Sequence, residues 1–373
     1  MADTVLLNTT AQLSGKTVTT AEGDYTITGA HTWDRDPSAP FAVTSGSAVV
    51  TNLDADKVDG YEGSALAVLA EAETITGLWT FNGGILVASG EESFLRHIAQ
   101  GRLTLTTALP VTVADVTAAG TIYYTPYSGD QIALYDGTNW KLYTFTERSL
   151  ALTATSGFPY DVFLYDNAGT LTLETLVWTN DTTRATALVL QNGVLCKTGA
   201  LTRRYLGSFY ATAANQTEDS YAKRMVWNYN NRVPRAMRRV ETTTSWTYTT
   251  ATVRQANGAA ANQLEVMVGW AEVPISVRVH GSCSNTGAGV NVWMGLGEDG
   301  SGGPHGSSVS STTTTPVAAY RVPLAASLDT YPAVGRHFYT WLEWSAAAGT
   351  TTWAGDDTAS TPMKTGLSGS IMG

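Results

Sequence analysis

Apolar and polar residues alternate in short bursts along most of the chain. The pattern is clear in "KTVTTAEGDYTITG" (16–29) and in "FAVTSGSAVVTNL" (41–53), where β-branched residues are separated by glycines. A period of two with this punctuation predicts strands and tight turns. Turn signals then recur every eight to twelve residues or so through the rest of the chain, a spacing typical of antiparallel sandwiches and barrels. The sequence therefore predicts a mainly β protein.

The strongest hairpin signals lie between residues 119 and 180. Three strands are predicted in "GTIYYTPYSGDQIALYDGTNWKLYTF", joined at 128–130 and at Asp136-Gly137. An Asp-Gly turn followed by a strand-like run is a good signal for a hairpin. The Leu-Tyr-Asp triplet at 134–136 with its following glycine occurs a second time at 164–166, which is followed by Gly169. A single echo without a fixed period disfavours solenoids and propellers.

Residues 53–84, "LDADKVDGYEGSALAVLAEAETITGLWTFNGG", interrupt this pattern. Ser64 can cap a short helix over "ALAVLAEAE", which ends near residue 74 because "TITG" follows. So short a helix is unstable alone in water, and its few leucines and valine cannot form a core of their own. We therefore expect it to pack against a partner. Further helical turns are predicted in "GEESFLRHIAQ" (90–100) and "EDSYAKRMVWNYNN" (218–231).

A chain of 373 residues is long enough for two or three domains. The changes of pattern divide it into segments. These are a β-rich segment 1–52, a segment 53–118 with the short helix, a β-rich domain 119–235, and a sandwich-like domain 236–373.

Few residues are charged, and this affects which partners the protein is expected to bind. Only 14% of the residues are charged, where about 25% is usual, so neutral faces are left that can pack against copies of the same chain. The net charge of −10 argues against nucleic-acid binding and against anionic membrane surfaces. No apolar run reaches the ~18 residues of a membrane span, and "MADTVLLNTT" does not resemble a signal peptide. We expect synthesis in a cytoplasm and two free thiols, Cys196 and Cys283.

Few residues suggest chemistry. Asp54, Asp56 and Asp59 resemble a calcium loop, but Val58 and Ala65 stand where an EF-hand requires oxygen ligands, so turn-forming aspartates are favoured. The glycines of "GLGEDG" (295–300) fit a dinucleotide pattern that a Gly/Ser loop follows instead of a helix. No histidine has a partner at metal-ligand spacing. No catalytic residue, metal or cofactor is predicted.

A basic cluster lies between residues 203 and 239, among tyrosines and a tryptophan. Such mixtures bind single-stranded nucleic acid or form pairs across subunit interfaces. The negative net charge favours the interface, with Arg235 and Arg238 as candidates. Among the 11 tryptophans, Trp341, Trp344 and Trp353 are candidates for stacking on sugar rings at loop tips.

Two stretches resemble known proteins. "LDADKVDGYEGSA" followed by "ETITGLWTFNGGI" is similar to a module of tailed-bacteriophage fibre proteins, with an Asp-Gly turn, a short helix and then a strand. In that family three subunits wind together, which implies an intertwined trimeric shaft over 53–118. The resemblance makes the following residues candidates for the subunit interface: Asp54, Asp56, Asp59, Leu66, Leu69, Trp79 and Phe81.

A second resemblance covers about 119–300, including "YDVFLYDNAGTLTLE", "TRRYLGSF" and "EDSYAKRMVWNYNNRVPR". It is to a domain of phage virion proteins. Together the two resemblances imply a non-enzymatic virion protein, a homotrimeric tail or head fibre. Residues 1–52 would attach to other virion proteins, and 119–373 would contact a glycan or protein on the host surface.

Three alternatives stay open. A capsid decoration protein would project from the head and stabilise it. A depolymerase would cut host polysaccharide, but the sequence gives no recognisable acid pair. A nucleic-acid binder would use the basic cluster at 203–239.

Overall fold

The computed structural model describes residues 57–58, 61–62, 95–355 and 364–373. The chain divides into two compact units, Met1–Phe81 and Asn82–Gly373. In the first unit, β1 (Lys57–Val58) pairs antiparallel with β2 (Tyr61–Glu62). The predicted helix at 64–74 lies outside the described residues, as do these interface candidates: Asp54, Asp56, Asp59, Leu66, Leu69, Trp79 and Phe81.

The second unit confirms the prediction of a mainly β fold. In its described part the helical element is a single 3-10 turn, η2 (Ala256–Gly258). The first group of strands, here called the N-terminal sheets, comprises β3 (Gly101–Thr104), β4 (Val116–Ala119), β5 (Thr121–Pro126), β6 (Gln131–Tyr135), β7 (Trp140–Thr144), β8 (Arg148–Ala151), β9 (Pro159–Asn167), β10 (Thr170–Val177), β11 (Leu188–Gln191), β12 (Val194–Lys197), β13 (Ala200–Ala213), β14 (Gln216–Asp219), β15 (Lys223–Arg224) and β16 (Val226–Asn228).

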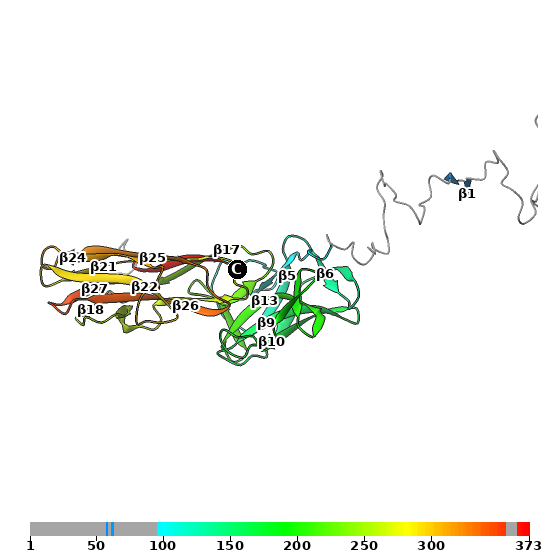
Figure 1. The fold of residues 1–373 in the computed structure, drawn as a ribbon, viewed down its shortest axis with the longest axis horizontal. Helices are drawn as coiled ribbons and strands as arrows, with labels where there is room; N and C mark the ends of the chain where they lie inside the picture. The colour runs from blue at the N-terminus through cyan, green and yellow to red at the C-terminus, as the bar shows by residue number, and fades with distance from the viewer. Residues whose placement is uncertain (1–56, 59–60, 63–94, 356–363) are drawn as a thin grey trace, which may run out of the picture. The chain divides into compact units, whose positions relative to one another are not determined.

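The remaining strands form what we call the C-terminal sandwich. They are β17 (Pro234–Val240), β18 (Ser245–Tyr248), β19 (Arg254–Gln255), β20 (Gln263–Val268), β21 (Ile275–Asn285), β22 (Val290–Glu298), β23 (Val309–Ser310), β24 (Thr312–Thr315), β25 (Val322–Thr330), β26 (Gly335–Ser345), β27 (Thr351–Ala354) and β28 (Gly366–Met372). In Figure 1 the sandwich strands lie on the left, and β5, β6, β9, β10 and β13 lie to their right.

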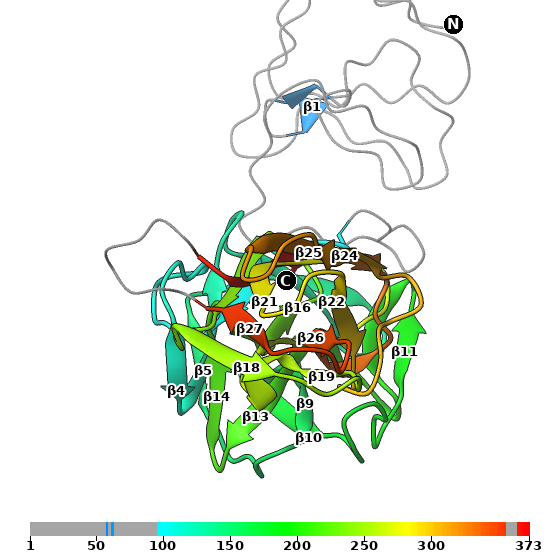
Figure 2. The same cartoon turned by 90° about the vertical axis from the view of Figure 1, so that its left-hand side faces the viewer.

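The C-terminal sandwich follows from alternation along its strands. One sheet has the order β17-β28-β21-β25-β23, and the other contains β20-β26-β22-β24. Buried and exposed positions alternate along β25, so one face turns to the core and the other to solvent. Figure 2 shows β25 and β21 on one side of β22 and β26. Between the sheets lies an aliphatic and aromatic core that includes Val277, Met294, Leu328 and Trp341.

The N-terminal sheets enclose a separate core. β9 pairs with β10 and β13, while β3, β5 and β8 form a three-stranded sheet, and β6 pairs with β7. Ile122, Val162 and Phe209 are fully buried among them. The Asp136-Gly137 hairpin is confirmed, because β6 and β7 pair with Tyr135 opposite Trp140.

A continuous sheet joins the two groups of strands. β13 leads through β14 and β15 to β20, and β15 pairs parallel with β20. A third core cluster also crosses this boundary, where Met267 of β20 packs with Tyr205 and Trp227 of the N-terminal sheets. The predicted boundary at 235/236 therefore falls inside β17, and the one at 118/119 falls inside β4, which pairs with β14.

Two sequence expectations need correction. Residues 218–231, predicted to hold a helical turn, form β14, β15 and β16 with short turns between them. Of the stretch 90–100, residues 90–94 lie outside the described residues, and 95–97 form a turn closed by a hydrogen bond from the Ile98 amide to the Leu95 carbonyl. In residues 218–231, Val226 and Trp227 are taken into sheet cores, and this burial outweighs a weak local helix preference.

Candidate functional site

The three tryptophans predicted to stack on sugars do not share an exposed surface. Trp341 and Trp353 are 1% and 0% exposed and belong to the sandwich core, so their rings are not available to a glycan. Trp341 instead packs edge-on against Trp246, with ring centroids 5.7 Å apart. Trp344 is half-buried on β26, and its role in glycan contact stays a prediction. Inward positions of a strand carry bulky rings as readily as loop tips do, and sequence cannot separate the two.

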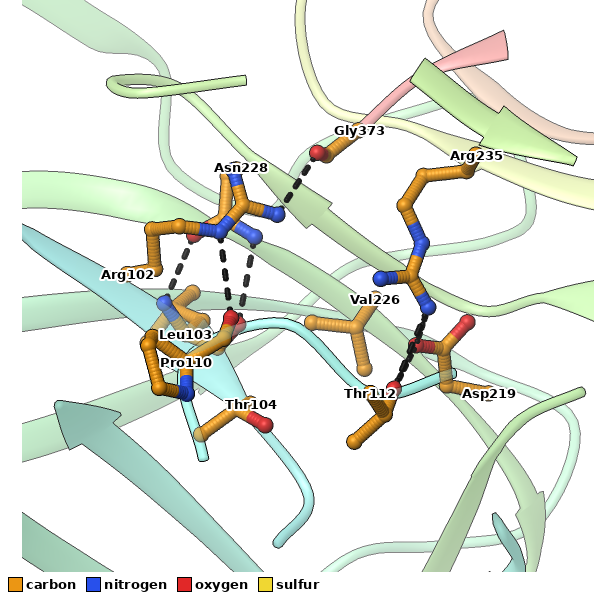
Figure 3. A pocket seen from close by; sticks show the side chains of 10 residues that line it. All are labelled: Arg102, Leu103, Thr104, Pro110, Thr112, Asp219, Val226, Asn228, Arg235 and Gly373. Atoms are coloured by element: carbon orange, nitrogen blue, oxygen red, sulfur yellow. Dashed lines mark hydrogen bonds and ion pairs between the residues drawn. The ribbon is translucent and has the colours of Figure 1, made fainter. Parts of the chain in front are cut away.

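Arg235 is not a free interface residue either. Its side chain is buried, and its Nη2 donates to Asp219 Oδ2 at 2.5 Å and to the Thr112 hydroxyl at 3.1 Å. Asp219 also accepts a hydrogen bond from Arg224 Nη1 at 3.0 Å. Figure 3 shows Arg235 and Thr112 converging on this carboxylate. The arginine is therefore used inside its own chain, whereas Arg238 is exposed and its interface role stays a prediction.

Arg102 extends this polar cluster along the boundary between the N-terminal sheets and the C-terminal sandwich, which we call the joint. Its guanidinium donates to the carbonyls of Pro110 (3.1 Å) and Gly373 (2.8 Å), as Figure 3 shows. It also contacts the carbonyl of Asn231. Burial, with Arg235 close by, lowers the pKa of Arg102 to about 10. The enclosed cavity measures about 10 Å³, room for about one water molecule. The cluster is therefore a structural joint and too small for a ligand.

Several residues of the basic cluster pair with carboxylates of the same chain. Lys223 lies near Glu218 and Glu265, and Arg203 pairs with Glu174. These pairs keep the basic side chains from forming an open stripe for a phosphate backbone.

A group of side chains with the right atoms for a metal ion lies at the ends of β22 and β26. Oxygen and nitrogen atoms of Glu298, Asp299 and His337 lie within 4.8 Å of one another. His337 Nδ1 is 2.7 Å from Asp299 Oδ2, and its Nε2 is 3.0 Å from the Ala333 carbonyl. Sequence spacing could not show this group, because β22 and β26 become neighbours only through the sheet.

The hydrogen bonds of this group favour an ion pair over metal ligation. Both nitrogens of His337 face oxygen acceptors, so the ring is best satisfied when it carries two protons. Although burial opposes the charge, these bonds and the Asp299 carboxylate raise the pKa of His337 above its usual value. Metal ligation needs a neutral imidazole, and so do nucleophile activation and proton abstraction.

His305 is fixed in a similar way. Its Nδ1 accepts from the Ser307 amide at 3.1 Å, and its Nε2 lies 3.1 Å from Glu298 Oε2. Glu298 also accepts from the Tyr339 hydroxyl at 2.9 Å. The two histidines therefore hold the Gly-rich 299–308 loop to the sheet.

The two thiols are buried and carry no disulfide. Burial raises the pKa of Cys196 to about 11 and that of Cys283 to about 12. Since a thiolate is the reactive form, both behave as small apolar side chains.

Comparisons with known proteins give no family for this chain. No family model matches the sequence, and no curated protein matches it. Solved structures with some likeness are the insecticidal delta-endotoxin Cry8Ea1 from Bacillus thuringiensis (6% identity, TM-score 0.20, 74% of this chain and 51% of that chain) and a Cry1Da tryptic core variant from the same organism (9%, 0.16, 72% and 54%). The match spans about half the length of these toxins. At such TM-scores the likeness carries no argument about fold or function. Within the described residues, no helix is long and apolar enough to cross a membrane.

Proposed function

We propose that the protein is a structural component of a tailed-phage particle, a homotrimeric fibre or spike whose β-rich part contacts the host surface. The resemblance of residues 53–84 to the fibre module carries this proposal. The helix predicted there is too short to be stable alone, and winding three copies together gives it the partners that it lacks.

The described part of the chain supports a rigid binding head. Long antiparallel strands end in loops rich in Gly, Ser and Thr, and the joint between the two groups of strands is filled by Tyr205, Trp227 and Met267. A stiff scaffold that presents loops is the arrangement on which many recognition surfaces are built. In a trimer, three weak sites gain avidity because they engage one surface together.

The role we propose is non-enzymatic. In the described part of the chain, the carboxylate and histidine group at Glu298, Asp299 and His337 is occupied by internal hydrogen bonds, as described above. A direct check is to incubate the purified protein with host capsule or lipopolysaccharide and to measure new reducing ends. We expect none, and release that a single carboxylate substitution abolishes would contradict the proposal.

Position on the particle tests the structural role. Gold-labelled antibodies against residues 95–355 would be applied to intact phage and viewed by electron microscopy. We expect a few labels per particle on tail or head fibres. Dense labelling over the capsid surface would indicate a decoration protein instead, and particles without any label would overturn the virion assignment.

A further inference from the structure

A second cavity is lined by residues from both groups of strands, with Arg204 on β13 and Glu272 after β20. Its volume is about 290 Å³, at the lower end of the range for small-molecule sites. Polar side chains dominate its lining, which includes His97, Arg204, Tyr229, Asn230, Arg232 and Glu272. It is therefore large enough for a single small polar molecule.

Arg204 lies on the wall of this cavity and has no carboxylate partner among the described residues. The side chain is 2% exposed, and its Nη1 donates to three backbone carbonyls, those of Arg96 (2.8 Å), Ile98 (3.0 Å) and Ala133 (2.7 Å). Its Nε is buried and has no hydrogen-bond partner among the described residues. The titratable groups that interact with it are Tyr124, Cys196 and Tyr229, and none of these is a carboxylate.

Two other arginines of the described chain, Arg184 and Arg224, have carboxylate partners, whereas buried Arg102, like Arg204, donates to backbone carbonyls. Arg184 makes two hydrogen bonds to the carboxylate of Asp161, and Arg224 binds Asp219. A buried charge without a counter-charge costs several kcal/mol, because desolvation is not offset by attraction. Burial lowers the pKa of Arg204, in keeping with that cost.

Arg232 adds a second cation to the same cavity. Its Nη2 is 2.5 Å from Glu272 Oε1, and its guanidinium lies over the Trp227 ring at 5.2 Å. Its Nη1 is buried without a partner among the described residues. Glu272 is 37% exposed and balances only one of the two arginines. Among the described residues, the arginines and the glutamate of the lining therefore leave one excess positive charge.

We propose that this cavity binds the carboxylate or phosphate group of a small anionic molecule. Arg204 supplies fixed positive charge from the wall, and Arg232 supplies a guanidinium whose Nη2 an oxyanion would share with Glu272. Asn230 and Tyr229 offer further polar contacts. An acidic sugar and free phosphate share this chemistry. The proposal does not rest on the virion role, and it would hold for a protein of another function.

The test is a titration of the purified 373-residue chain by calorimetry with three probes: galacturonate, inorganic phosphate and galactose. We expect galacturonate to bind and galactose not to bind. Galacturonate binding more tightly than phosphate would identify an acidic saccharide as the ligand, whereas equal binding would identify the free anion. Absence of binding by both anions would overturn the proposal, and so would equal binding of galactose.

Substitutions of residues that line the cavity test whether the anion binds there. Arg232→Gln should weaken it by about tenfold or more, because a charge-assisted hydrogen bond is lost. Glu272→Gln should tighten binding by roughly threefold, because it removes a competing exposed carboxylate. The matched control is Arg203→Gln, since Arg203 pairs with Glu174 and lies over the Tyr165 ring at 4.1 Å, away from the cavity residues. Unchanged affinity in both cavity variants would place the anion elsewhere and contradict the assignment.

Discussion

Arg235 of β17 and Asp219 of β14 form a buried ion pair, with Nη2 2.5 Å from Oδ2. The two residues come from the C-terminal sandwich and the N-terminal sheets, so the pair ties the two groups of strands together. Arg224 binds the other oxygen of the same carboxylate. One aspartate therefore holds two buried arginines at the joint.

Replacing this aspartate should destabilise the protein strongly. Asp219→Asn leaves Arg224 and Arg235 buried without a counter-charge, and breaking such a pair costs about 3–5 kcal/mol. Chemical unfolding followed by tryptophan fluorescence measures the loss. The control is Glu174→Gln at the more exposed Lys197 and Arg203 pairs, where about 1 kcal/mol or less is expected. Equal losses in the two variants would contradict the role given to Asp219.

Stability should fall as pH rises past neutrality through His337. The folded state raises the pKa of His337 above its usual 6.5, so the contribution is complete below 6.5 and is lost as pH rises through the folded value. The pKa of Asp299 is lowered, although burial opposes this, because His337 and the Phe338 amide donate to it. Its contribution is therefore lost as pH falls below its ordinary value of 3.8.

The measurement is the unfolding free energy of the wild type and of His337→Gln from about pH 5 to about pH 9. We expect the difference between the two proteins to be largest at the acid end and to shrink towards the alkaline end. A difference that does not change with pH would show that folding does not shift the pKa of His337, and a difference that grows towards the alkaline end would show that folding lowers it.

Replacing the two tryptophans of β26 should lower the free energy of unfolding by different amounts. Trp341→Ala removes a ring that is 1% exposed and should cost about 3–5 kcal/mol. Trp344→Ala removes a half-buried ring three residues away and should cost clearly less. Thermal unfolding by circular dichroism compares them. Equal losses would contradict the burial pattern of this strand.

The sequence predicted the class of fold because alternation and Asp-Gly turns are local signals. The hairpin of β6 and β7 is a direct outcome of Asp136-Gly137, where Gly137 has φ +108°. The pairing of β15 with β20 was not predictable. It joins residues some forty positions apart in parallel, and no hairpin turn connects the two strands directly. Long-range pairing of this kind leaves no local pattern.

The candidate sites were harder to predict for the same reason. Trp341 and Trp353 were read as loop-tip rings, but their strands turn these side chains inward. The cavity at Arg204 and Arg232 was not predicted, although both residues were noted as part of a basic cluster. The missing information was which arginines have a carboxylate partner, and that depends on side chains from Glu174, Asp219 and Glu272 meeting them in space.

The mass of the purified protein in solution tests the central claim most directly. Light scattering coupled to size exclusion would measure it without reference to shape. The account predicts a mass of three times 39.6 kDa, as expected for a trimer held together through residues 53–84. A single species of 39.6 kDa over the whole concentration range would contradict the intertwined fibre.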